Sequence, residues 1–169
     1  MYGSVASIKI PQLVALLQST HPNASIKVIA TTHALHFFDR ATVPVPVLTE
    51  DDEWSAWTKR SDPVLHIDLR NWADIMVVAP LDANTLAKLA GGLCDNLLTC
   101  ILPCFMAPAM NTHMWNHPFT SKHLALVNQT SYKVIPPISK LLACGDLGMG
   151  AMAEIGTIVE HITEVMKKE

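Results

Sequence analysis

Apolar residues follow two alternating spacings along the chain. The continuous apolar run at residues 75–79 is typical of a buried parallel strand, whereas the spacing across residues 5–19 and 157–168 is helical. Trp54 and Trp57 stand three residues apart, which predicts a helix that buries one face. Further strands are expected at residues 25–30, 103–107 and 133–135, and residues 42–48, with two prolines among valines, are expected to form at best an edge strand or an extended loop. Further helices are expected at 33–38, 51–60, 82–90, from Asp95 and at 120–128. Strands that alternate with helices predict an α/β fold: a Rossmann-like or flavodoxin-like parallel sheet with helices on both faces.

Composition supports one compact domain over residues 1–169. Half of the residues are apolar and 16% are charged, which excludes a disordered chain. The net charge of −3 gives no electrostatic reason to bind nucleic acid or an anionic membrane. We see no targeting segment and no apolar run long enough to span a bilayer, so a cytoplasmic protein is expected. The four cysteines form no zinc motif, and we expect no metal site.

Four polar turns stand where ligands bind in such sheets, beyond strand ends or at helix starts. Small residues at a helix N-terminus leave N–H groups free for a phosphate, so the turns together suggest a phosphorylated cofactor. Each turn alone is equally explained as a helix cap. No GxGxxG or GxxxxGK[ST] motif is present. The residues of these turns are Gly3, Ser4 and Val5; Thr31, Thr32 and His33; Asp82, Ala83, Asn84 and Thr85; and Ala109, Met110 and Asn111.

Three other residues are candidates for chemistry. His66 lies in an apolar stretch and is either a core histidine or a general base. Asn111 follows a buried strand, where it either donates to a carboxylate or caps the helix toward Trp115. Cys144 opens a glycine-rich segment that extends to Glu154, which predicts a mobile lid carrying an acid–base group, or else a surface loop with an incidental thiol.

The motifs together resemble those of the homo-oligomeric flavin-containing cysteine decarboxylases, and their residues are most similar to those of the plant members. The resemblance covers nearly the whole chain in family order. It rests on Gly3 to Ala6, Asp62 to Ile67, Ala79 to Leu86, Pro108 to Asn111 with Met114 and Trp115, and Cys144 to Glu154.

The resemblance implies an FMN-dependent lyase that converts 4′-phospho-N-pantothenoylcysteine to 4′-phosphopantetheine, on the route to coenzyme A. It also implies a homotrimer with the flavin near a subunit interface. Direct loss of CO₂ from a cysteine carboxylate would leave an unstabilised carbanion, and the flavin supplies the missing electron sink. By resemblance, His66, Asn111 and Cys144 are catalytic; Asn111, Met114, Gly145 and Asp146 bind substrate; and Gly3, Ser4, Val5, Thr31, Thr32, His33, Ala83, Asn84, Thr85 and Ala109 surround FMN.

The sequence departs from the family in two places. The family has an apolar strand before Gly3, where this sequence has Met1 and Tyr2, and it has a longer helical end after Cys100. Strands that neighbour the first one are expected to be left with unpaired backbone groups. Two alternatives therefore stay open. One is a regulatory or binding protein of this fold, of the phosphatase-regulating type, and the other is a different flavin-dependent cysteine decarboxylase.

Overall fold

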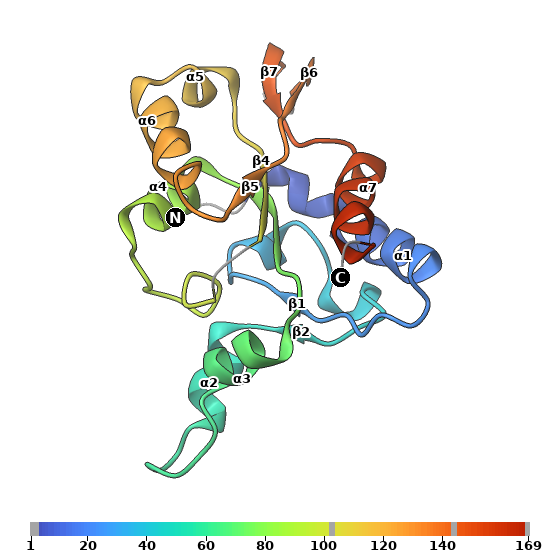
Figure 1. Ribbon diagram of the computed structural model, residues 1–169, viewed down its shortest axis with the longest axis vertical. Helices are drawn as coiled ribbons and strands as arrows, with labels where there is room; N and C mark the ends of the chain where they lie inside the picture. The colour runs from blue at the N-terminus through green and yellow to red at the C-terminus, as the bar shows by residue number, and fades with distance from the viewer. Residues whose placement is uncertain (1–3, 102–103, 143–144, 168–169) are drawn as a thin grey trace.

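The computed structural model describes residues 4–101, 104–142 and 145–167 and shows a mixed α/β fold. Five parallel strands fall into two sheets, one pairing β1 with β2 and one in the order β3-β4-β5, and β6 and β7 form an antiparallel hairpin (Figure 1). The strands are β1 (Val28–Ile29), β2 (Val47–Leu48), β3 (Val77–Leu81), β4 (Phe105–Pro108), β5 (Lys133–Val134), β6 (Ile138–Leu141) and β7 (Leu147–Ala151).

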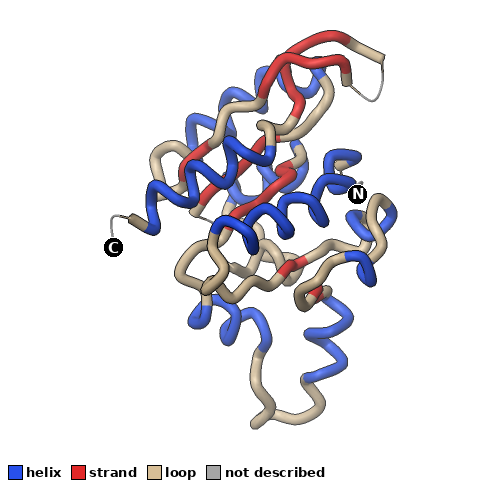
Figure 2. Tube along the Cα trace, turned by 90° about the vertical axis from the view of Figure 1, so that its right-hand side faces the viewer, coloured by secondary structure: helices blue, strands red, loops and turns tan. Residues whose placement is uncertain are grey.

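Helices cover both faces of the three-stranded sheet, as the alternating pattern predicts (Figure 2). Helices α1 (Ile10–Thr20) and α7 (Ile155–Met166) pack together, as do α4 (Ala83–Gly91) and α6 (Pro118–Val127). Successive residues of β4 point to opposite faces: Phe105 and Ala107 join a core with α1 and α7, and Met106 joins a core with α4 and α6. The remaining helices are η1 (Val5–Lys9), η2 (Ala34–His36), η3 (Arg40–Thr42), α2 (Glu50–Ala56), α3 (Leu65–Trp72) and α5 (Thr112–Trp115).

The tryptophan helix begins within one residue of its predicted start but ends at Ala56, four residues before the predicted end, and its predicted burial is wrong. Helix α2 begins with Thr49 and Asp52 in a reciprocal capping box and has four acidic residues in its first turn. Trp54 is 62% exposed, and Trp57, just beyond the helix, is 45% exposed. Helices α2 and α3 extend away from the sheets at the lower end of the molecule, where no further layer covers them (Figure 1).

The helix predicted from Asp95 is also wrong, because the segment forms only turns. The Asn96 side chain accepts from the Thr99 backbone N–H at 3.0 Å, and the Thr99 hydroxyl accepts from the Asn96 N–H at 3.2 Å. This reciprocal pair satisfies the backbone groups of a single turn, closed by the Cys100 N–H to the Asn96 carbonyl at 3.1 Å. Residues 102–103 lie outside the described residues, so the shortened connection there is not described.

The glycine-rich segment is a strand rather than the expected loop. Residues of β7 pair with β6, and the Gly150 carbonyl accepts from the Met110 N–H at 2.9 Å. Gly150 has φ +133, and a side chain there would run into the Met110 carbonyl. Glu154 follows the hairpin and binds both Lys9 (3.0 Å) and Lys140 (3.1 Å). The hairpin is therefore anchored at its base to the β4–α5 turn and to the helical layer.

Candidate functional site

A cleft of about 890 Å³ opens where the two parallel sheets fail to join. It is lined by β1 on one side and β3 on the other, with α1 beneath, and its volume lies in the range of small-molecule sites. Three predicted cofactor residues, Ser4, Thr31 and Thr85, line this one cleft. The chain brings them together because each follows a strand or opens a helix at this edge.

Local hydrogen bonds hold the three hydroxyl-bearing residues in position. The Ser4 hydroxyl accepts from the Ala6 N–H at 3.3 Å, and the Thr31 hydroxyl accepts from the Ala34 N–H at 3.3 Å. The Thr85 N–H donates to the Asp82 carboxylate at 2.6 Å, which caps α4. The capping interpretation is therefore confirmed for the turns at Ser4 and Asp82, whereas η2 has His33 at its N-cap with no side-chain cap bond. Because the Ser4 and Thr31 hydroxyls act as acceptors in these bonds, their protons stay available to a ligand.

The other predicted cofactor residues lie near these turns without lining the cleft. Val5, Thr32, His33 and Asn84 are exposed, and Ala83 is half-buried in the first turn of α4. Ala109 is buried at the end of β4, where its N–H donates to the Leu81 carbonyl at 2.8 Å. Gly3 lies outside the described residues.

A second group of predicted residues lies around the hairpin. Asn111 caps α5 by accepting from the Met114 N–H at 2.8 Å through Oδ1. Its side-chain amide makes no hydrogen bond to any other described residue, so a donor remains for an anion. Met114 is 51% exposed. Gly145, with φ +90, and Asp146 form the exposed turn of the hairpin. Cys144 lies outside the described residues.

His66 is held by an acidic partner that sequence reasoning missed. On α3 its Nδ1 lies 2.6 Å from Oε1 of Glu53, which comes from α2. A carboxylate is an acceptor, so Nδ1 donates and Nε2 is left to accept a proton. The imidazole is about one-third exposed, so the core-histidine interpretation is not supported. Glu53 lies thirteen residues earlier with no helical spacing to His66, so no local sequence signal marks the pair.

The structure does not bring His66 and Asn111 together within one chain. Helix α3 lies at the lower end of the molecule and the hairpin at the opposite end (Figure 1). His66 and Asn111 also do not line the cleft that holds Ser4 and Thr31. The predicted site is therefore divided into three places in a single chain.

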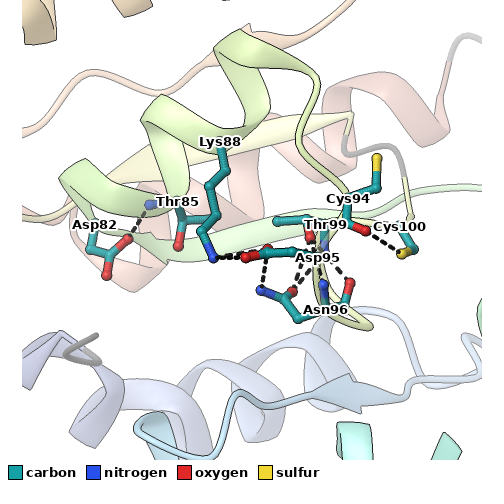
Figure 3. Close-up of polar contacts among 8 residues, drawn as sticks. All are labelled: Asp82, Thr85, Lys88, Cys94, Asp95, Asn96, Thr99 and Cys100. Atoms are coloured by element: carbon teal, nitrogen blue, oxygen red, sulfur yellow. Dashed lines mark hydrogen bonds and ion pairs between the residues drawn. The ribbon is translucent and has the colours of Figure 1, made fainter.

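A buried lysine organises the segment after α4 (Figure 3). The Lys88 side chain is 9% exposed, and its Nζ lies 2.6 Å from Oδ2 of Asp95. The hydrogen bond from the Lys88 ammonium holds the pKa of the Asp95 carboxyl below its usual range. The pair fixes the turn that carries Asn96 and Thr99 against α4.

Replacing Asp95 with asparagine is expected to destabilise the protein at pH 7 by about 1 kcal/mol, because it removes the ionic partner of the buried Lys88 ammonium. The effect stays this small because Asp95 is half exposed and solvent partly screens its charge. Because folding lowers the pKa of Asp95, the ion pair adds its full stabilisation above the ordinary aspartate pKa of about 4. That stabilisation is lost as the pH falls through the lowered pKa of the folded state. Urea unfolding should show the difference at pH 7 and its disappearance in strong acid. The exposed Glu160→Gln variant is the control. An Asp95→Asn effect that persists unchanged at low pH would contradict the ion-pair origin.

One feature near the site was not found from sequence. The Thr112 hydroxyl is buried with no hydrogen-bond partner among the described residues, and it lies next to Asn111 and faces Gly148. Within the described part of the chain no group of three metal-ligating side chains gathers. No described helix is long and apolar enough to cross a membrane.

The chain is similar to known flavoproteins over nearly its whole length. The family model described as Flavoprotein matches residues 1–167. A phosphopantothenoylcysteine decarboxylase of Oryza sativa subsp. japonica is 53% identical over 99% of this chain and 79% of its own, and one of Mus musculus is 50% identical over 98% and 84%.

Solved structures that are similar to this chain come from the same kind of protein. A cysteine-to-serine mutant of PPC decarboxylase complexed with pantothenoylaminoethenethiol superposes with a TM-score of 0.92 at 49% identity, covering 98% of this chain and 94% of that one. The FMN binding protein AtHal3 gives 0.89 at 48% identity, with 99% and 94% covered. The chain therefore belongs to the flavoprotein family and, within it, to the phosphopantothenoylcysteine decarboxylases.

Proposed function

We propose that this protein is an FMN-dependent lyase that decarboxylates 4′-phospho-N-pantothenoylcysteine to 4′-phosphopantetheine in coenzyme A biosynthesis. The observation that carries the proposal is the near-complete superposition on a decarboxylase complexed with pantothenoylaminoethenethiol. That ligand is a decarboxylated, unsaturated form of the cysteine moiety. A thiol-bearing product of this class fits a reaction in which the cysteine carboxylate is lost.

The residues of the cleft fit a phosphorylated flavin. Ser4, Thr31 and Thr85 place three hydroxyl groups at its wall, and Thr85 lies in the first turn of α4, where helix N–H groups favour an anion. The named hydroxyls would hold the phosphate of FMN. When bound, FMN would supply a temporary two-electron acceptor for loss of CO₂ from the cysteine carboxylate and would return those electrons afterwards, so that the overall reaction is redox-neutral.

The chain's own residues supply binding and proton transfer. The Asn111 amide donates to the substrate carboxylate and orients it, with Met114, Gly145 and Asp146 beside the bound molecule. His66 accepts a proton at Nε2 while Glu53 holds its Nδ1. The Cys144 thiol returns a proton to the product.

We also propose a homotrimer whose active sites form between copies. The support is the distance between α3 and the hairpin, because one chain cannot bring His66 to Asn111. A neighbouring copy can supply the missing side chain through a head-to-tail interface that closes into a ring. We place the reaction in the cytoplasm, supported by the free thiols of Cys94, Cys100 and Cys104.

The test is a flavin absorbance spectrum and oligomer mass of the purified protein, followed by incubation with 4′-phospho-N-pantothenoylcysteine. We expect a yellow trimer that releases CO₂ and forms 4′-phosphopantetheine. A protein that binds FMN and forms no product would overturn the enzymatic proposal. A colourless monomer that takes up no FMN would favour the regulatory alternative.

Cys144→Ser is expected to stall after decarboxylation, because a serine hydroxyl is a far weaker acid than a thiol with a pKa near 8.5. The unsaturated thiol should accumulate, with CO₂ released once per site, as mass spectrometry and CO₂ measurement would show. Cys94→Ser, at an exposed thiol outside the site, is the control and should turn over normally. Normal turnover by Cys144→Ser would remove the thiol from the reaction.

A further inference from the structure

The carboxylate of Glu53 holds two groups of α3 at once. Its Oε1 lies 2.6 Å from Nδ1 of His66, and the same oxygen accepts from the His66 backbone N–H at 3.3 Å. Both groups belong to one residue, so a single oxygen fixes the start of the helix and the direction of the imidazole ring together. The ring therefore takes its position from α2 as well as from α3, the helix that carries it.

Helix α3 needs this acceptor because it has no side-chain cap of its own. Val64 stands at its N-cap and makes no side-chain cap bond, so the first N–H groups of the helix need other partners. The His66 N–H is one of them, and Glu53 supplies the acceptor from the neighbouring helix. The helix dipole also favours a negative charge at this end. Glu53 is thus held at the place where it meets the imidazole.

Helix α2 is locked at the residue before Glu53. Asp52 closes the capping box with Thr49, which is buried, and it also binds Arg40 at 3.1 Å. The hydrogen bonds from Thr49 hold the pKa of the Asp52 carboxyl below its usual range. Two neighbouring carboxylates therefore have separate partners: Asp52 fixes the start of α2, and Glu53 reaches across to α3.

The charge of Glu53 faces the imidazole. Its side chain is only 11% exposed, and in the described part of the chain no lysine or arginine forms an ion pair with it. A carboxylate removed from water is stabilised by a charge partner. When His66 takes up a proton at Nε2, its contact with Glu53 becomes such an ion pair. The arrangement therefore supports a ring that gains a proton at Nε2 while Nδ1 stays bound.

We propose that Glu53 is a positioning residue of the decarboxylase. It fixes His66 as the tautomer protonated at Nδ1, holds the ring so that Nε2 stays free, and stabilises the imidazolium that forms when Nε2 takes a proton from the substrate. The proton is released to water before the next turnover. The inference rests on the proposed function for the proton that moves, whereas the tautomer is a property of the folded chain by itself.

The first test reads the tautomer from the ¹⁵N NMR spectrum of the full chain labelled at histidine, in mildly alkaline buffer where histidines are neutral. The spectrum of His66→Gln assigns the His66 signals. We expect a protonated Nδ1 and an unprotonated Nε2 in the native protein, and loss of this preference in Glu53→Ala. The control is Asp51→Asn, which removes one negative charge from the same turn of α2 and should leave the His66 signals unchanged. A native ring protonated at Nε2, or an unaltered ring in Glu53→Ala, would overturn the proposal.

The second test separates kcat from KM. Glu53→Gln keeps an oxygen acceptor and loses the charge, so kcat should fall about tenfold with little change in KM, since Glu53 acts through His66 and does not bind substrate. Glu53→Ala should lose roughly 100-fold in kcat, at the low end of what a general base contributes. Asp51→Asn should keep native kinetics. Unchanged kcat in both Glu53 variants of an active enzyme would exclude the positioning role.

Chemical rescue distinguishes positioning from a merely structural role. Formate is a small carboxylate that can occupy the space left in Glu53→Ala, so it should restore part of kcat and the native His66 tautomer, whereas chloride at the same ionic strength should restore neither. Restoration by both salts alike would point to general stabilisation and contradict the proposal. If the native chain forms no product, the proposed function fails, and the NMR spectra with and without formate still decide whether Glu53 sets the tautomer.

Discussion

Replacing Gly150 with alanine is expected to lower the free energy of unfolding by about 2–4 kcal/mol and to displace the hairpin. Gly150 has φ +133, a backbone region that L side chains rarely adopt, and an added Cβ would run into the carbonyl of Met110. The backbone must move to relieve the overlap, and the hydrogen bond from the Met110 N–H to the Gly150 carbonyl is then lost. Thermal unfolding should shift downward by roughly 5–15 °C.

The same substitution elsewhere provides the control. Gly156 lies in α7 with open space around it, so Gly156→Ala should be neutral or slightly stabilising through its higher helix propensity. Because Asn111 follows Met110 directly, decarboxylase activity should fall in Gly150→Ala and persist in Gly156→Ala. Equal melting temperatures for the two variants would show that the hairpin does not depend on the close approach at Gly150.

Asn111→Asp is expected to reduce kcat/KM at least 100-fold while leaving the fold intact. Aspartate caps a helix as well as asparagine does, so the bond from the Met114 N–H is kept. The substitution removes an amide donor to the substrate carboxylate, worth about 1.5–3 kcal/mol, and adds like-charge repulsion. Steady-state kinetics and a thermal melt on the same sample separate a loss of catalytic efficiency from a loss of stability. Asn111→Ser, a neutral cap, should lose less activity, and an unimpaired Asn111→Asp would remove this residue from carboxylate binding.

Combining two inactive variants tests whether the site is shared between copies. His66→Ala should be inactive by itself for lack of the proton acceptor. If His66 and Asn111 act from different copies, co-expressed His66→Ala and Asn111→Asp chains should regain about a quarter of the native activity, because a quarter of the random interfaces carry both native residues. Failure of the mixed trimer to recover activity would place both side chains in one copy's site.

The layers of the fold were predictable because burial imposes periodicity. The apolar run at residues 75–79 marks β3 with a shift of two residues, and the face of α7 formed by Ile158, Val159 and Ile162 is buried as its spacing indicates. The caps at Ser4, Asp82 and Asn111 could be read locally, because a cap binds a backbone group two or three residues away.

What could not be predicted depends on contacts between distant segments. The pairing of Glu53 with His66 requires α2 to lie beside α3, and the exposure of Trp54 reflects the lack of a covering layer at that end. The hairpin was missed because three glycines within six residues signal flexibility, whereas Gly150 is fixed by its contact with the β4–α5 turn. The proposed meeting of site residues from different copies likewise depends on assembly and not on local sequence.

The break between β1 and β3, where the two parallel sheets do not join, has a consequence for the cooperativity of unfolding. In the described chain no backbone hydrogen bond crosses it, and only side chains such as those of Ile29 and Met76 connect the two parts through a shared cluster. Separation of β1 from β2 therefore breaks no backbone hydrogen bond of the β3-β4-β5 sheet. The segment around β1 and β2 is therefore expected to exchange its amide protons through a local opening of lower free energy than that of the β3-β4-β5 sheet.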